Sequence, residues 1–152
     1  MRFLPIVLLF LLVFEMPGCK SIQGGDLTGA WVMKDASRQV LPTELQKASA
    51  KLVLDANGTF VASELPEELP LVAPYDVKNR NVRLDTGSGV WKIVSREGKQ
   101  QVQLDFHTMA GSKEGGVPYG TQMDVSRGWS AVSLYYFLGD ADEGRRVSFE
   151  RK

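Results

Sequence analysis

Alternation of apolar and polar residues is the dominant pattern along this chain. The segment QVQLDF places Val102, Leu104 and Phe106 on one face and polar residues on the other, as in a strand with one buried face. The same period recurs from residue 29 to the C-terminus. The pattern predicts eight strands, at residues 29–34, 50–55, 58–64, 88–95, 100–106, 119–125, 130–138 and 145–151.

Turn signals separate these strands at short intervals. Residues 55–58 (DANG) and the pair Glu97-Gly98 are typical of tight hairpins, and residues 139–144 form a longer, acidic turn. Strands joined in this way are antiparallel neighbours. We therefore expect an all-β fold, an up-and-down barrel of about eight antiparallel strands, because closure removes exposed strand edges. One short helix is expected between strands 1 and 2, where Thr43 and Gln46 form a weak capping box.

The connections alternate between short and long. The long ones are residues 35–49, 65–87, 107–118 and 139–144, and a meander brings all four to the same end of the barrel. Loops over a rigid barrel are a common setting for binding. This expectation depends on the strand count, because a ninth strand at residues 81–84 (NVRL) would move the two later loops to the other end.

The segment DLTGAWV, residues 26–32, resembles the opening of lipocalin-like and related calycin barrels. In that family a G-x-W motif, matched here by Gly29 and Trp31, closes one end of the barrel. The resemblance implies an arginine from the last strand over the tryptophan face, a cation–π contact. Arg146 and Arg151 are both candidates for that role. DANGTF followed by GVWKI is also similar to small bacterial lipocalin-like lipoproteins.

A barrel of eight strands holds either its own side chains or one small ligand. If it binds a small apolar ligand, the ligand enters between the long loops, with Trp129 and Tyr119 at the rim. Of Tyr135 and Tyr136, strand alternation allows only one to face inward. The alternative is an interaction module of the envelope whose core is filled by large side chains, among them Trp31, Trp91, Phe60 and Phe137.

Composition excludes several function classes. The 152 residues suit one domain, and 18 basic residues balance 18 acidic ones, so no charge surplus favours nucleic-acid binding. One cysteine and one histidine cannot form an internal disulfide or a zinc site built from Cys and His. We expect no metal, no cofactor and no catalytic residues, and hence no enzyme.

The first residues predict the cellular location of the protein. The apolar run FLPIVLLFLLVF, residues 3–14, fits a signal peptide and is shorter than the roughly 20 residues of a membrane-spanning helix. Residues 16–19 (MPGC) resemble the lipobox of bacterial lipoproteins, which implies cleavage before Cys19 and diacylglycerol modification of its thiol. We expect a signal peptide at 1–18, a tether at 19–25 and the barrel domain at 26–152. The protein would then be anchored in the cell envelope, at the periplasmic face of the outer membrane in a diderm host.

Overall fold

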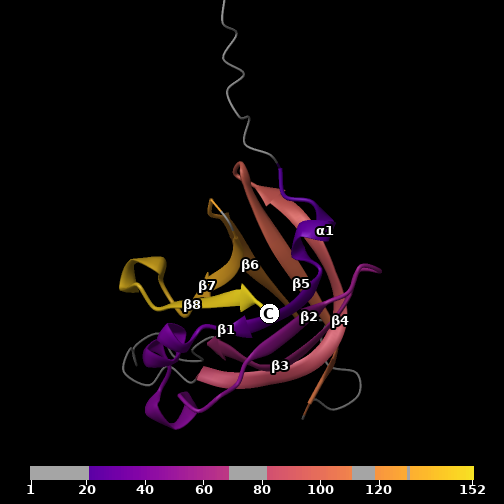
Figure 1. The fold of residues 1–152 in the computed structure, drawn as a ribbon. Coiled ribbons are helices and arrows are strands. Elements are labelled where there is room, and N and C mark those ends of the chain that lie inside the picture. Colours follow the sequence, from indigo (N-terminus) through magenta and orange to yellow (C-terminus); the bar gives the residue numbers. More distant parts are fainter. Residues whose placement is uncertain (1–20, 69–81, 111–118, 130) are drawn as a thin grey trace, which may run out of the picture.

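The chain forms a closed barrel of eight antiparallel strands in sequence order, with β1 paired to β8 (Figure 1). The computed structural model describes residues 21–68, 82–110, 119–129 and 131–152. The strands are β1 Gly29–Met33, β2 Lys51–Leu54, β3 Thr59–Glu68, β4 Val82–Arg96, β5 Lys99–Met109, β6 Tyr119–Arg127, β7 Val132–Phe137 and β8 Arg146–Arg151. The predicted fold class is therefore confirmed.

The eight predicted strands are all present, and residues 82–84, described here, do not form a separate ninth strand. The NVRL stretch is largely the beginning of β4, which starts at Val82 and is paired to β3. The connections β1–β2, β3–β4, β5–β6 and β7–β8 consequently meet one end of the barrel, here called the loop end. Residues 69–81 and 111–118 of these connections lie outside the described residues. The other end, the terminal end, carries the three short turns and the last residues of β8.

The long strand β4 bends where its glycines lie. A Cβ on Gly89 would stand 2.0 Å from the carbonyl oxygen of Asp105, so no other residue fits there. Phe60 and Phe106 pair with Gly89 from the two flanking strands, and their rings meet edge to face at 4.9 Å. The glycine thus lets the strands approach and bend, and the two rings cover the space above it.

Two turns have the backbone that the sequence predicts. Glu97 and Gly98 have φ of 51° and 76°, the combination of a tight hairpin. Gly58 has φ of 84°, and Asn57 accepts a hydrogen bond from the Thr59 amide at 2.9 Å. A further positive φ, 54° at Glu64, marks a bulge in β3 that sequence did not indicate.

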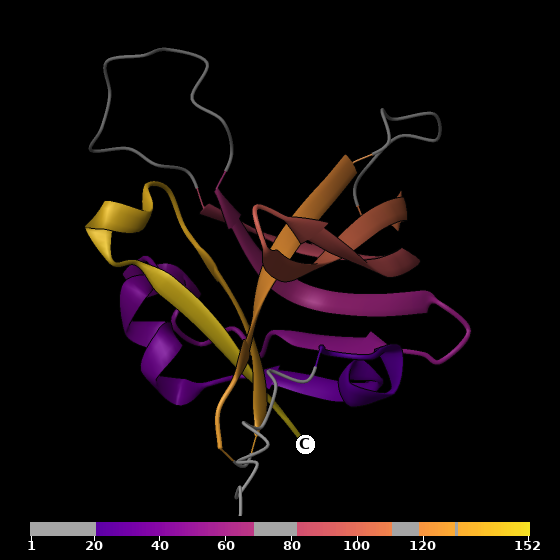
Figure 2. The ribbon, with the colours of Figure 1, turned by 90° about the horizontal axis from the view of Figure 1, so that it is seen from above.

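The connection β1–β2 differs from its prediction. Two 3-10 helices, η1 Asp35–Val40 and η2 Thr43–Leu45, take the place of the one short helix expected, and Thr43 begins η2 without capping it. Pro42 separates them, because it has no N–H to continue a helix from η1. The 3-10 helix η3 Ala141–Glu143 forms the β7–β8 connection, and Figure 2 shows all three on one side of the barrel.

The expected tether is packed against the barrel from Ile22 onward. Ile22 is buried; its amide donates to Gln100 Oε1 at 2.7 Å, and Gln100 Nε2 donates to its carbonyl at 3.1 Å. A single helical turn, α1 Gly24–Leu27, follows, and Asp26 Oδ2 accepts from the amide of Gln23 at 3.0 Å. The described chain therefore begins against the β4–β5 hairpin.

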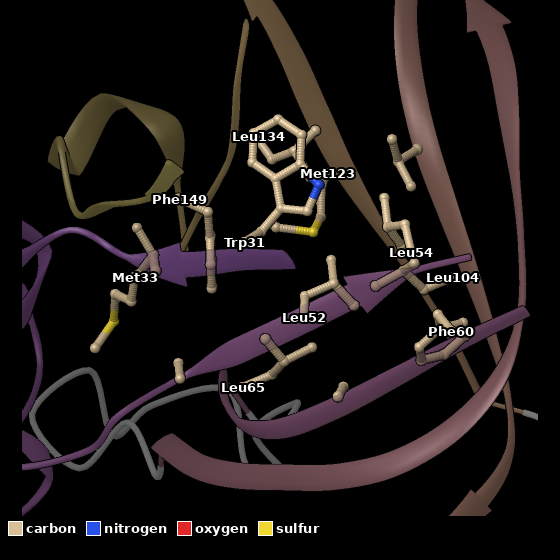
Figure 3. Close-up of a cluster of buried hydrophobic side chains, with 14 of the residues drawn as sticks. Trp31, Met33, Leu52, Leu54, Phe60, Leu65, Leu104, Met123, Leu134 and Phe149 are labelled. Atoms are coloured by element: carbon tan, nitrogen blue, oxygen red, sulfur yellow. The ribbon is translucent and has the colours of Figure 1, made fainter. Parts of the chain in front are cut away.

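The barrel interior is packed with large apolar side chains. Trp31, Phe60 and Phe149 are each at most 1% exposed, and Figure 3 shows them converging with leucines and methionines from other strands. Burying each side chain of this size contributes about 1.5–3 kcal/mol. Within the described part of the chain, no helix has the length and hydropathy to cross a membrane.

Candidate functional site

The G-x-W motif lies at the terminal end. Trp31 is fully buried, and its indole Nε1 donates to the Leu27 carbonyl of α1 at 2.8 Å. Arg151 lies over the Trp31 ring, with Cζ 5.8 Å from the centroid, and donates to the Thr28 carbonyl. Gly29 has φ of 124°, and a Cβ there would come within 3.2 Å of Arg151 Nε. Gly29, Trp31 and Arg151 therefore form one cluster.

Arg146, the other candidate, does not join this cluster. Its guanidinium stacks on Tyr135, with Cζ 3.7 Å from the ring centroid. Leu134 is buried in the core, so alternation along β7 turns Tyr135 outward. The Arg146–Tyr135 contact is thus on the outer surface, and of the two arginines it is Arg151 that lies over the Trp31 ring.

Tyr136 is the inward-facing member of the tyrosine pair. Its ring stacks on Phe149 with centroids 6.1 Å apart. Its hydroxyl donates to the carbonyl of Pro66 in β3. Because β3 and β7 lie on opposite sides of the eight-strand order, this side chain bridges the interior.

The two expected rim residues lie at opposite ends. Tyr119 opens β6 at the loop end and is half-buried against Phe106, with ring centroids 5.6 Å apart. Trp129 lies in the β6–β7 turn at the terminal end and is fully exposed. A ligand mouth that uses both residues is therefore wrong for this barrel, because the long β5–β6 connection and the short β6–β7 turn lie at opposite ends.

Trp91 follows Gly89 in the same G-x-W spacing as Gly29 and Trp31, and it is half-buried at the terminal end. Its Nε1 donates to the Asp55 carbonyl at 2.9 Å, and Gly24 of α1 lies against its ring edge. A shallow recess of about 380 Å³ lies between α1, the β2–β3 turn and this ring. Trp31 and Trp91 thus each donate to a backbone carbonyl, Trp31 inside the core and Trp91 at its margin.

A larger recess opens where β7 and β8 separate. Their pairing runs only from Leu134–Phe149 to Phe137–Arg146, while β8 continues along β1. The resulting fork encloses about 680 Å³ and is lined by Trp31, Val132, Trp129, Arg127, Arg151 and Glu150 among others. Its floor is apolar and its walls carry charges of both signs.

Arg127, which belongs to no recognisable sequence motif, also lines this recess. Its Nη2 lies 2.5 Å from Asp26 Oδ2, an ion pair that ties the β6–β7 turn to α1. Arg127 also lines a third recess, which contains Ser21, Ile22 and Lys99. The start of the described chain and the fork are therefore neighbours. The sequence carries no signal for this, because the pairing spans 101 positions.

Polar groups at the loop end have structural partners. The Glu64 carboxylate accepts from the Ser49 amide at 2.7 Å, and Asp140 accepts from Asp142 within the acidic turn. Asp85 is buried, whereas His107 is exposed. Among the described residues, no three His, Cys, Asp or Glu side chains are grouped as metal ligands would be.

Comparison with known proteins adds no assignment. No family model, no curated protein and no solved structure matches this chain.

Proposed function

We propose that this protein is a non-enzymatic, lipid-anchored component of the cell envelope that acts through its outer surface. The barrel serves as a rigid scaffold with a filled core. The observation that carries this proposal is the Tyr136 bridge, which joins β7 to the Pro66 carbonyl of β3 across the interior.

The packing around this bridge supports the same function. Phe149 stacks on Tyr136, and the Phe60–Phe106 pair fills the space beside β4. A ligand of drug size needs a cavity of roughly 300–1,000 Å³. Three recesses of that size lie at the terminal end, at the fork, beside α1 and beside Ile22, and they open to the surface.

Anchoring is supported by sequence and by the position of Ile22. The lipobox-like MPGC ends at Cys19, outside the described residues, and only Lys20 and Ser21 separate that cysteine from buried Ile22. Two acyl chains hold a protein stably at a membrane, at about 0.8 kcal/mol per buried CH₂ group. The proposed anchor thus joins the barrel at its terminal end.

A pair of variants on β7 tests the filled core. Tyr136→Ala removes the bridge and opens space in the interior, whereas Tyr135→Ala removes a ring of the same size from the outer surface. We expect the wild type and Tyr135→Ala to leave the fluorescence of 1-anilinonaphthalene-8-sulfonate unchanged, and Tyr136→Ala to raise it. Strong dye binding by the folded wild type would contradict the filled core.

A small apolar ligand is the second candidate. The specific observation in its favour is the half-buried apolar lining toward the loop end, formed by Val82, Met109 and Tyr119. Native mass spectrometry of protein purified from its own host distinguishes the two. A co-purified molecule released by Phe106→Ala or Tyr119→Ala would establish ligand binding, and an unliganded mass favours the interaction module.

A further inference from the structure

The terminal end presents an isolated aromatic side chain to solvent. Trp129 is fully exposed in the β6–β7 turn, although a side chain of this size usually buries most of its surface. Among the described residues, the other large apolar side chains classed as exposed are Val61 and Val90, at 55% and 38%. Core packing therefore does not explain why a tryptophan occupies position 129.

The start of the described chain lies close to this turn. Two hydrogen bonds to Gln100 hold Ile22 at the terminal end, and Arg127 lines both the recess beside Ile22 and the fork beside Trp129. An extended chain covers at most about 3.3–3.6 Å per residue. Cys19, three residues before Ile22, is thus within about 11 Å of it.

Exposed cations accompany Trp129 at this end. Arg96 and Lys99 flank the β4–β5 turn, and Arg151 and Lys152 end the chain. Among the described residues, exposed Asp55, Glu97 and Glu150 are acidic side chains at the same end. Tryptophan is enriched at the boundary between lipid and water, and basic residues are attracted to anionic headgroups.

We propose that the terminal end is a membrane-contacting surface, with Trp129 inserted among the headgroups of an anionic phospholipid bilayer. The inference rests on the proposed anchor at Cys19, which confines this end to the lipid surface. The loop end then points away from the membrane. A protein partner seated on the fork is the competing occupant, but the short anchor and the exposed cations favour lipid.

Quenching by brominated lipids tests this contact directly. The full-length lipidated protein is reconstituted in vesicles of phosphatidylethanolamine and phosphatidylglycerol whose acyl chains are brominated near the headgroup. We expect the wild type to lose tryptophan emission, and Trp129→Phe to lose distinctly less, because the remaining Trp31 is buried and Trp91 half-buried. Val61→Ser, an exposed apolar position on β3, should behave as the wild type.

Charge reversal provides a second, matched readout. Arg96→Glu with Lys99→Glu should reduce quenching in vesicles containing phosphatidylglycerol and have less effect in phosphatidylcholine vesicles. Lys47→Glu with Lys51→Glu makes the same charge change at exposed positions toward the loop end and should leave quenching unchanged.

The outcomes separate the contact from the anchor. Equal quenching of the wild type and Trp129→Phe, in a chain whose mass includes the acyl groups, overturns the contact and leaves the anchor standing. A mature chain without acyl groups contradicts the anchor, and the contact inference falls with it.

Discussion

Arg151 joins three parts of the molecule at the level of a single side chain. It covers Trp31, donates to the Thr28 carbonyl and stands at the end of β8, where the barrel closes on β1. We expect Arg151→Ala to lower the free energy of unfolding by about 1–2 kcal/mol, since it removes a cation–π contact and a hydrogen bond from a charged donor. Urea unfolding followed by tryptophan fluorescence measures the loss.

Arg146→Ala is the matched control for Arg151. Arg146 also stacks on an aromatic ring, that of Tyr135, but on the outer surface. Its loss should cost at most about 1 kcal/mol, the value of an exposed cation–π pair. Equal losses for the two variants would show that Arg151 has no special part in closing the barrel.

Gly89 is a position where one methyl group is predicted to be severely destabilising. A Cβ would stand 2.0 Å from the carbonyl oxygen of Asp105, so β4 and β5 would have to separate. We expect Gly89→Ala to cost at least about 3 kcal/mol, the upper part of the usual range for overpacking. A Cβ at Gly25 would have no atom within 4 Å. Gly25→Ala should therefore leave the thermal unfolding temperature unchanged or raise it slightly.

Sequence alone identified the residues of the motif but not their geometry. Gly29 and Trp31 could be assigned from G-x-W, whereas the choice between Arg146 and Arg151 depends on which one lies at the β1 seam. Strand alternation settled that one tyrosine of the pair faces inward, and the burial of Leu134 shows that it is Tyr136. The register of the strands, and the end of the barrel at which a side chain lies, are properties of the closed sheet. Short motifs therefore do not encode them.

At the scale of elements, η1 is fastened to β8 by one buried serine. Ser37 Oγ accepts from the Ser148 amide at 2.9 Å and lies 3.4 Å from its carbonyl, and Ser37 is only 5% exposed. We expect Ser37→Ala to cost about 1–3 kcal/mol, because it leaves the partly buried Ser148 amide without this partner. The same substitution should accelerate hydrogen exchange of the Ser148 amide.

Ser49→Ala provides the comparison for this prediction. Ser49 belongs to the same connection, but it is exposed, so its change should stay within about 0.5 kcal/mol, as for surface substitutions in general. An unchanged exchange rate at Ser148 in Ser37→Ala would contradict the fastening of η1 to β8.

Elements were predictable where side-chain alternation and turn glycines agree. All eight strands and the tight turns at Gly58 and Gly98 follow from that agreement. The helical segments were not predictable in the same way. Pro42 divides the connection into two short 3-10 helices, and the single turn α1 depends on tertiary contacts of Ile22 and Leu27 that no local pattern reveals.

At the scale of the whole molecule, the two ends of the barrel differ in construction. The loop end receives the four long connections, whereas the terminal end holds α1, the short turns and the last residues of β8. Because the described chain starts against the β4–β5 hairpin, an anchor before Ile22 would set the direction in which the long connections face. The proposed envelope location and the proposed interaction surface are thus linked through one covalent attachment.

Cys19→Ala tests that attachment in the host cell. Cys19 is the chain's only cysteine, so its loss removes the one thiol that diacylglycerol could modify. We expect the variant to accumulate as an unprocessed precursor or to release the folded domain from membranes, while Ser21→Ala is processed and fractionates as the wild type. Mass spectrometry and detergent phase partitioning measure both results. A Cys19→Ala chain that is still cleaved to full mature size and still sediments with membranes would show that the barrel is held there by some other means.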